Sequence, residues 1–466
     1  MKVIRVLGIV LVVASLMAGC GSSAATPTSA PTVAPAQATN TPEAVPTVAA
    51  TATEAVAPTV AATATEAVAP TTAATATEAV APTAAATATE AVAATSGSTA
   101  NWGVVKVPAG QPIIIGMGAG TSGDVANLGI DERRGAELAV EDHPEIRGHK
   151  VQMAFEDDLC SGEGGTAVAQ KMVANPQVVA FIGDMCGSGG VPASTIYEQA
   201  GIPMVSPSIT AVAFTARGLR VTNTVSMSDA TQGATAADYM FKTLGLKKIA
   251  VLHDGSTYGQ GIAEVVRDQF TKDGGTVTAF EGITVGEKDF RAVLTKIAAD
   301  KPEGIYFGGF QAEASVLASQ RSEVGLGDTV FFTDEGCFSD AFIKAAGDAA
   351  NGVYATMAET KDSDALKAFR DRYKAKYGDN PTDIGPYHAH AYDAMSLVIA
   401  AIDKVAVDDG NGNLTIDRAK LVDAIRQTKG YQGLTGEITF NERGERMGLA
   451  VIVYQVKDGK WEPVSQ

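Results

Sequence analysis

From Pro112 onward the hydrophobic pattern repeatedly changes period, and this alternation constrains the fold more than any other feature. Short apolar runs such as 113–115 and 178–182 predict buried strands. The stretches between them have a helical period, and 289–299 shows a one-sided apolar stripe. Strands this short and apolar, each followed by a helix, indicate parallel sheets that helices cover on both faces.

Two series of such strands predict an α/β protein with two doubly wound, Rossmann-like lobes. The expected strands are 113–115, 151–155, 178–182 and 204–205 in the first series, and 249–252, 277–280, 305–307 and 330–332 in the second. A last strand is expected at 449–454, after helices at 363–377, 388–405 and 418–427. Ligands of such sheets bind at the carboxyl ends of the strands, so the cleft between the lobes is the expected site.

The first twenty residues have the pattern of an export signal. Lys2 and Arg5 accompany an apolar run at 6–17, which is too short to span a bilayer. The run ends at Leu-Met-Ala-Gly-Cys, residues 16–20, which resembles the lipobox of bacterial lipoproteins. The resemblance implies cleavage before Cys20 and a lipid on that cysteine. An ordinary signal peptide or a weak membrane anchor is the alternative.

Residues 21–105 are predicted to be a disordered tether. Most of this segment consists of Ala, Thr, Pro, Val and Glu, and four near-identical twelve-residue units begin at Pro46, Pro58, Pro70 and Pro82. Repeats can indicate a solenoid, but these units have little apolar bulk to bury, and their prolines break helices. A flexible coil of this length would span on the order of 50 Å.

The charge of the chain excludes one class of partner. The formal net charge is -17, from 36 basic and 53 acidic side chains. Because Lys and Arg form no block, we expect no nucleic-acid partner. The sequence gives no sign of oligomerisation, so we expect a monomer.

A glycine-rich segment at 118–123 formally matches a dinucleotide-binding fingerprint. The fingerprint requires an acidic residue about 20 positions further on. Here Asp157 and Asp158 lie more than 30 positions past Gly123. We therefore interpret the glycines as a loop that brings backbone close to a ligand, and we expect no cofactor.

His388, His390 and Asp393 raise the question of a metal site. On a helix only His390 and Asp393 would share a face, so an ordinary helix surface is the better interpretation and no metal is expected. The sequence contains no Gly-x-Ser-x-Gly elbow, and none of its histidines has an evident nucleophile beside it in sequence. We therefore do not expect an enzyme.

Two cysteines follow strand-like segments. Cys160 and Cys186 lie 26 positions apart, and strands neighbouring in sequence are often neighbours in a sheet. A disulfide between them is favoured, and two free buried thiols are the alternative. Cys337 has no evident partner and is expected to be free.

Several ordered motifs are similar to those of bacterial branched-chain amino acid-binding proteins, the periplasmic leucine/isoleucine/valine receptors of ABC importers. They are FEDDLCSGEGGTAVAQKMV, VVAFIGDMCGSGGVPAS, IPMVSPSITAVAFTARG, LHDGSTYGQG, GITVGEKDFRAVLTKI, IYFGGFQAE and the TDEG segment at 333–336. The resemblance covers nearly all of 112–466. It also implies the disulfide Cys160–Cys186, because the two cysteines sit where the family's disulfide sits.

The resemblance implies a type I periplasmic binding protein fold that closes like a Venus flytrap. Lobe 1 would comprise 110–230 plus 358–442, and lobe 2 would comprise 231–357 plus 443–466. The hinge would have three segments, near 229–232, 356–360 and 440–444. Such a receptor is extracytoplasmic, captures an amino acid by hinge closure and delivers it to an ABC permease; here a lipid at Cys20 would hold it to the membrane. A sensor of the same fold and a receptor for an amide or urea are the alternatives.

The family holds the ligand carboxylate with backbone N–H groups and a hydroxyl just after the second cysteine, at the positions of Gly187 and Ser188. Thr210 matches a further donor. A carboxylate removed from water needs such donors, and loops at helix starts supply them. Thr210 could instead cap the following helix.

The ligand ammonium group would be met by the carbonyl of Ser208, by Thr210 and by Glu335 in the TDEG loop. Burying an ammonium ion without a counter-charge would cost several kcal/mol, which gives Glu335 a physical role. Tyr258 matches a tyrosine that closes over the ligand. Glu335 and Tyr258 could alternatively be ordinary exposed loop residues.

The sequence departs from the family's leucine receptors in the pocket. Gly187 replaces a serine, so one hydroxyl is lost or shifted to Ser188. Leu128 and Phe310 stand where those receptors have tyrosine, and Tyr387 lies near an aromatic pocket position. We therefore expect a retained site for the amino-acid head group and a changed side-chain pocket that favours a branched-chain or other apolar amino acid.

Overall fold

The computed structural model describes residues 101–378, 380 and 384–464. The predicted signal, Cys20 and nearly all of the predicted tether lie outside these residues. Val104 and Val105, which we assigned to the tether, instead begin strand β1 (Val104–Val107). This strand pairs antiparallel with β14 (Leu414–Asp417), and it is ordered because Val105 and Val107 are buried in the core of lobe 1. In the described part of the chain, no helix is long and apolar enough to cross a membrane.

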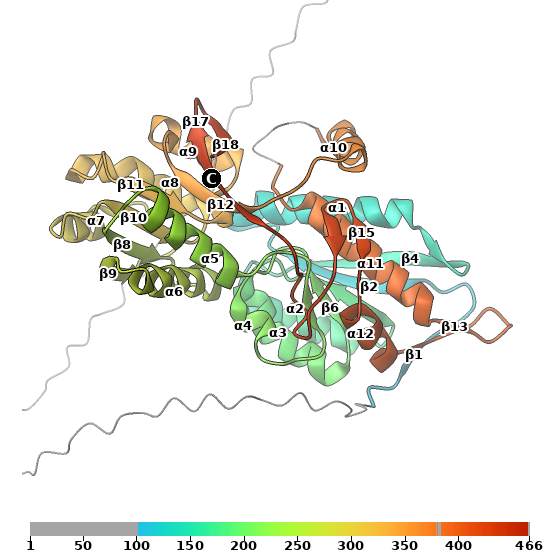
Figure 1. Cartoon of the computed structure of the whole chain (residues 1–466). Coiled ribbons are helices and arrows are strands. Elements are labelled where there is room, and N and C mark those ends of the chain that lie inside the picture. The colour runs from blue at the N-terminus through green and yellow to red at the C-terminus, as the bar shows by residue number, and fades with distance from the viewer. Residues whose placement is uncertain (1–100, 379, 381–383, 465–466) are drawn as a thin grey trace, which may run out of the picture. The chain divides into compact units, whose positions relative to one another are not determined.

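Lobe 1 is built on a six-stranded sheet that is parallel except for its first edge strand. Its strands, in spatial order, are β3 (Glu145–Ile146), β4 (His149–Asp157), β2 (Ile113–Ala119), β5 (Val178–Ile182), β6 (Met204–Ser206) and β7 (Thr222–Thr224). Helices α1 (Ala126–Asp142) and α11 (His388–Val405) lie side by side on one face (Figure 1). Helices α2 (Gly162–Ala174) and α3 (Gly187–Ala200) cover the other face.

The alternation of side chains along the strands explains these two layers. Ile113, Ile115 and Met117 of β2 pack with α1 and α11, whereas Ile114 packs with α2 and α3. A strand that is buried on both faces must be apolar at nearly every position, as the sequence predicted. Helix α12 (Arg418–Arg426) packs against α11 and completes the lobe.

Lobe 2 is built on a seven-stranded sheet in which only β17 (Val451–Lys457) runs antiparallel to the other strands. Its strands, in spatial order, are β18 (Lys460–Pro463), β17, β12 (Tyr354–Ala358), β11 (Val330–Thr333), β10 (Gly304–Gly308), β8 (Lys248–His253) and β9 (Thr276–Gly282). Helices α5 (Asp229–Asp238) and α6 (Thr257–Lys272) pack on one face. Helices α7 (Arg291–Ala298), α8 (Gln311–Gln320) and α9 (Asp340–Ala346) pack on the other.

The sequence pattern missed some elements of lobe 2. Helix α8 contains five polar residues among its ten, and most of them are buried, so it has no clear apolar stripe. Helix α5 is short and rich in Ala and Thr, and β12 was not recognised between its neighbours. The last strand, expected at 449–454, begins two residues later as β17. The remaining predicted strands and helices are present within a few residues of their expected bounds.

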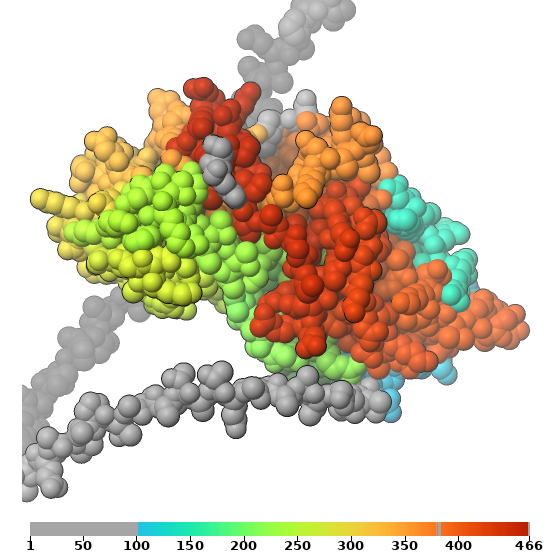
Figure 2. Space-filling view, viewed as in Figure 1, coloured from blue at the N-terminus to red at the C-terminus, as the bar shows by residue number. Residues whose placement is uncertain are grey.

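The described chain crosses between the lobes after β7, after β12 and between β16 (Gly436–Ile438) and β17, near the three expected hinge segments. The first and last crossings are held together, because the Thr224 N–H donates to the Gly444 carbonyl at 2.9 Å. In Figures 1 and 2 the red C-terminal segment runs from the region of α12 to β17. The bounds differ slightly from the expected ones: α5 packs on α6 from Asp229 onward, and Ala358 still belongs to β12 of lobe 2.

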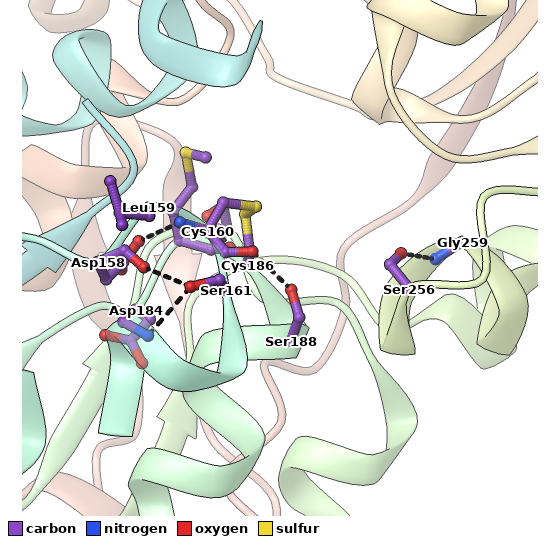
Figure 3. Close-up of a disulfide and its surroundings, with 12 residues drawn as sticks. Asp158, Leu159, Cys160, Ser161, Asp184, Cys186, Ser188, Ser256 and Gly259 are labelled. Carbon is purple, nitrogen blue, oxygen red and sulfur yellow. Dashed lines mark hydrogen bonds between the residues drawn. A yellow bond between two sulfur atoms is a disulfide. The ribbon is translucent and has the colours of Figure 1, made fainter. Parts of the chain in front are cut away.

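The structure joins Cys160 to Cys186 in a disulfide with a Cα–Cα distance of 5.2 Å (Figure 3). Cys160 follows β4, and Cys186 follows β5 and precedes α3. These strands are not direct neighbours, since each pairs with an opposite edge of β2. Their carboxyl ends nevertheless meet at the same edge of the sheet. Cys337 is buried and free, as expected.

Replacement of both Cys160 and Cys186 by serine should destabilise the protein. The bond spans 26 positions of sequence, so its loss should lower the free energy of unfolding by about 3.5 kcal/mol, chiefly through added freedom of the unfolded chain. Denaturant titration followed by circular dichroism measures this difference. Reducing agent should lower the stability of the unmodified chain to that of the variant and leave the variant unaffected. Equal stability of the two proteins without reducing agent would contradict the prediction.

Candidate functional site

A small cavity lies where the carboxyl ends of the strands of both sheets meet. Lobe 1 contributes Leu128, Met185, Cys186, Gly187, Ser208, Ile209 and Thr210, lobe 2 contributes Tyr258, Phe310, Glu335 and Gly336, and Tyr387 comes from the segment before α11. The cavity is partly open and offers about 30 Å³, which is room for one or two water molecules. All of the ligand-contacting residues predicted from the sequence line this cavity except Ser188.

The start of helix α3 supplies backbone donors to one side of the cavity. Gly187 is the first residue of α3, and the first N–H groups of a helix have no partner within it. These groups and the helix dipole make the position favourable for a carboxylate. A side chain at Gly187 has no room, because a Cβ there would lie 2.9 Å from the Cβ of Ala211.

Ser188 does not take over the hydroxyl that the family carries at the preceding position. Its Oγ turns away from the cavity and donates to the carbonyl of Cys160 at 2.9 Å (Figure 3). This contact ties the start of α3 to the other half of the disulfide. Of the two outcomes that we expected for this hydroxyl, loss or a shift to Ser188, the structure favours loss, because the Ser188 proton is already used within lobe 1.

The loop after β6 carries Ser208 and Thr210 into the cavity. The Ser208 hydroxyl donates to the Met185 carbonyl at 2.9 Å, and the Ser206 hydroxyl accepts from the Ile209 N–H at 2.9 Å. Thr210 does not cap the following helix α4 (Val212–Thr215), whose N-cap residue is Ala211. Its hydroxyl instead donates across the cleft to Oε1 of Glu335 at 3.2 Å.

Glu335 follows β11 and is only 3% exposed. Its hydrogen-bond partners at the side chain are neutral: Thr210 at Oε1 and the Gln232 amide at Oε2. Burial raises the pKa of Glu335, and the hydrogen bond from Gln232 opposes this effect. A buried carboxylate with only neutral donors is stabilised strongly by a cation that enters the cavity.

A second buried carboxyl group stands beside the first. Asp229, in the first turn of α5, is 1% exposed, and the nearby Thr210 hydroxyl donates to Glu335. Burial raises the pKa of Asp229 well above its ordinary value, and the charge of Glu335 adds to this effect. The lobe 2 side of the cavity is therefore short of positive charge.

Aromatic rings form the apolar part of the cavity. The rings of Tyr258 and Phe310 lie 5.3 Å apart between centroids. The Tyr258 hydroxyl accepts from the Gly336 N–H at 3.2 Å, which positions this ring over the loop that carries Glu335. Tyr387 is held by its N–H, which donates to Asp131 at 3.0 Å. Leu128 adds aliphatic surface from α1.

Sequence reasoning missed the polar residues of α5 and part of the apolar wall. Asp229 and Gln232 lie three positions apart and face the same side of the helix, a spacing that could have indicated a shared role. Because no helix was predicted there, the spacing of Asp229 and Gln232 could not be interpreted as a shared face. Met185 and Ile209 were missed because apolar residues next to strands are ordinary core residues.

Residues 112–460 match the model of a family described as periplasmic binding protein. This match covers well over half of the chain. The chain belongs to the periplasmic binding protein family. The structure agrees with this membership, since both lobes present their strand ends to the same cavity.

This periplasmic binding protein is similar to several characterised relatives. The leucine-, isoleucine-, valine-, threonine- and alanine-binding protein of Pseudomonas aeruginosa is 32% identical over 351 residues, covering 74% of this chain and 90% of the relative. The crystal structure of a leucine-binding protein, LivK, from Thermotoga maritima has a TM-score of 0.68 at 25% identity, covering 76% of this chain and 98% of the other. A branched-chain amino acid transporter substrate-binding protein, LivJ, from Streptococcus pneumoniae, in complex with isoleucine, has a TM-score of 0.66 at 26% identity, covering 76% and 99%.

The residues considered for a metal, His388, His390 and Asp393, are buried in this periplasmic binding protein, so our interpretation of an ordinary helix surface is wrong. His388 Nδ1 lies 3.0 Å from Oδ1 of Asp131. Asp393 accepts from the N–H groups of Leu434 and Thr435, at 2.6 and 2.9 Å. Among residues 101–378, 380 and 384–464, no group of acidic, histidine or cysteine side chains is arranged to hold a metal ion.

The lack of room for a side chain at Gly187 can be tested by substitution. Gly187→Ser, although it introduces the residue of the family's leucine receptors, should lower the free energy of unfolding by about 1–3 kcal/mol, because its Cβ meets Ala211 at 2.9 Å. The double change Gly187→Ser with Ala211→Gly should recover most of the loss. Thermal unfolding of the three proteins measures both effects, and full stability of the single variant would refute the steric argument.

Proposed function

We propose that this protein is an extracytoplasmic receptor that binds a free, apolar α-amino acid, with leucine, isoleucine and valine as the preferred class, and delivers it to an ABC importer. The observation that carries the proposal is the composition of one cavity. A buried carboxylate, Glu335, and the donor groups at the start of α3 line the same small space. This arrangement complements a zwitterion, which carries both charges on neighbouring atoms.

Each end of the ligand has a physical partner in this proposal. The ligand carboxylate accepts from the backbone N–H groups at Gly187 and Ser188 and from Thr210. Its ammonium group pairs with Glu335, and the Ser208 carbonyl and Asp229 are further acceptors. Because Glu335 has only neutral partners in the structure, the ammonium group supplies the charge that its burial requires.

The side chain of the ligand would contact the apolar part of the cavity. Leu128, Phe310 and Tyr387 offer aliphatic and aromatic surface and no free charge. An aliphatic side chain therefore gains about 25 cal/mol for each Å² of apolar surface removed from water. The relatives named for leucine, isoleucine and valine support this class.

Binding requires the lobes to separate and close again. The space of about 30 Å³ is far smaller than an amino acid, so a ligand enters only when the lobes part or the lining side chains shift. Contacts across the cleft favour closure, such as Thr210 to Glu335 and the Gln311 amide to Asn127 at 2.8 Å. A ligand that bridges the lobes shifts the equilibrium by its higher affinity for the closed state. The closed form is the state that a permease would recognise.

The proposal assigns no catalytic step to the site. Its acidic residues are buried acceptors, and the relatives reported above are binding proteins. A receptor returns its ligand chemically unchanged, which mass spectrometry of leucine recovered after prolonged incubation measures directly. Attachment to the membrane through a lipid on Cys20 is part of the proposal, and the mass of the mature N-terminal peptide tests it.

Glu335→Gln should weaken leucine binding at least tenfold, because the amide keeps the shape of the side chain and removes its charge. Isothermal titration of the full chain with L-leucine measures the dissociation constant. Glu323→Gln is the matched control, since Glu323 is an exposed acid of the same lobe that pairs with Arg291 at 2.6 Å. Equal affinities for the unmodified protein and Glu335→Gln would remove Glu335 from the site.

The same titration separates the two charges of the ligand. 4-Methylpentanoate lacks the ammonium group of leucine and should bind the unmodified chain poorly. Its affinity should not fall on Glu335→Gln, because this ligand has no cation to lose a partner and its carboxylate is no longer repelled by Glu335. An equal tenfold loss for both ligands would show that the substitution damages the site as a whole.

A further inference from the structure

A group of buried carboxyl groups lies behind the ligand site in lobe 1. Glu132 of α1, Asp158 at the end of β4 and Asp184 after β5 are each 0% exposed. We call them the carboxyl trio. Asp158 and Asp184 each precede a cysteine of the disulfide by two residues, and Figure 3 shows both beside that bond. None of the three contributes to the cavity lining.

The trio is packed against backbone, with little room around it. A Cβ on Gly118 would lie 2.8 Å from Oδ1 of Asp184 and 3.5 Å from Oδ2 of Asp158. Both carboxyl groups therefore lie against the same glycine at the end of β2. Asp158 uses Oδ1 to accept from the Cys160 N–H at 2.7 Å. Its Oδ2 and all four oxygens of Asp184 and Glu132 have no donor in normal hydrogen-bond geometry, and Asp158 and Asp184 are close enough to hold a proton between them.

The hydroxyl next to Glu132 offers it no proton. Glu132 lies beside Ser208, whose hydroxyl already donates to the Met185 carbonyl at 2.9 Å. While the Ser208 proton is used in this way, a protonated Glu132 can donate to the Ser208 oxygen, and an ionised Glu132 lacks a donor. A Ser208 hydroxyl turned toward Glu132 would lower the pKa of Glu132, against the larger effect of burial.

The charged neighbours of the trio carry the same sign. Asp131 and Asp157 add negative charge, whereas β2, β5 and β6 contain no charged residue. Tyr197 of α3 lies near Asp184, and its hydroxyl is buried without a partner.

The cations on the surrounding helices have other partners. In α1, Arg133 and Arg134 lie over the rings of Phe155 and Tyr377. Lys171 of α2 pairs with Glu156, and His388 of α11 contacts Asp131. Three ionised carboxyl groups buried without a cation would cost many kcal/mol, so protons must replace the missing counter-charge. Burial raises the pKa of Asp158 to about 6 and the pKa of Asp184 and Glu132 well above their ordinary values.

We propose that Glu132, Asp158 and Asp184 share protons as one unit that holds the ligand-binding loops of lobe 1, and that loss of these protons at higher pH loosens the loops and weakens ligand binding. The connection to the site is short. The Asp184 carbonyl accepts from the Ser206 hydroxyl at 2.8 Å, and Ser208, which lies beside Glu132, donates to the Met185 carbonyl at 2.9 Å. Negative charge on the trio also repels a ligand carboxylate held at the start of α3.

The sign of the stability effect follows from the raised pKa of each group. Unfolded Asp and Glu titrate near pH 4, whereas the folded trio keeps protons to about pH 6 or higher. Between these values the folded chain binds more protons than the unfolded chain, so the free energy of unfolding falls as the pH rises. The loss is complete once the pH exceeds the folded pKa of the group.

Asp184→Asn removes one charge of the trio and keeps the shape of the side chain. The melting temperature of this variant, relative to that of the unmodified full chain, should rise by about 5 °C between pH 5 and pH 8, measured by scanning calorimetry without ligand. If the variant does not fold, as judged by circular dichroism, Glu132→Gln replaces it with the same expectation.

Asp157→Asn is the matched control, since Asp157 is the sequence neighbour of Asp158 and is partly exposed. Burial acts to raise the pKa of Asp157, but hydrogen bonds from the Leu159 N–H and the Ser122 hydroxyl outweigh it and lower the pKa. Asp157 is therefore ionised in both states above pH 5, and its variant acts on the trio only through the charge that it removes beside Asp158. Its difference in melting temperature should therefore change with pH much less than that of Asp184→Asn. An equally small change for Asp184→Asn would overturn the proposal.

The second arm of the test rests on the proposed function and uses L-leucine, which keeps both charges from pH 5.5 to pH 8. Glu335 and Asp229 also titrate, so the measured quantity is the ratio of the dissociation constants of the unmodified chain and Asp184→Asn. This ratio should rise about tenfold across the range. A constant ratio would refute the coupling to the site. If leucine binds neither protein at any pH, the proposed function fails, and the melting experiment still decides whether the trio holds protons.

Discussion

Charge that is buried without a counter-charge is the constraint on which both lobes depend. In lobe 2 it concerns Glu335, which is 3% exposed and is contacted by neutral donors only. In lobe 1 it concerns the carboxyl trio, since the described cations on the helices around it have other partners. The two cases are resolved differently in our proposals, because Glu335 lines the cavity that a ligand cation would enter, whereas the trio lies outside that cavity and is neutralised by protons. The cost of burying an unpaired charge thus favours ligand binding in lobe 2. In lobe 1 it makes the support of the ligand-binding loops depend on pH.

The parallel sheets determine where these groups meet. The carboxyl ends of β4 and β5 bring Cys160 and Cys186 together across β2, and the first turn of α3 follows at once. In lobe 2 the loops after β10 and β11 carry Phe310 and Glu335 to the facing side of the cavity. The disulfide and the hydrogen bond from Ser188 to Cys160 then fix the loop after β4 to the start of α3. Ligand capture needs such rigid halves, because closure can favour a ligand only if each half keeps its shape.

Much of the fold could be predicted from residues alone, and the site could be predicted only in part. The short apolar strands were recognisable because a strand covered on both faces has few polar positions. Glu335, Thr210 and Tyr258 were found through motifs shared with a family, and the structure brings them to one cavity. Asp229 and Gln232 were missed because α5 has a weak apolar face. Ser188 was expected to offer its hydroxyl to the ligand, but a hydroxyl can rotate toward any nearby acceptor, and here the acceptor is Cys160.

By itself the sequence determined the two series of strands, the cysteines that follow them and the chemistry available at the loop ends, since these depend on local periodicity and residue type. Only the tertiary structure decided that a serine has no room at Gly187, that Asp229 stands beside Glu335, and that Glu132 joins two aspartates from other strands. The reason is that burial and steric room depend on residues far apart in the chain. No local pattern records which carboxyl groups will be enclosed together.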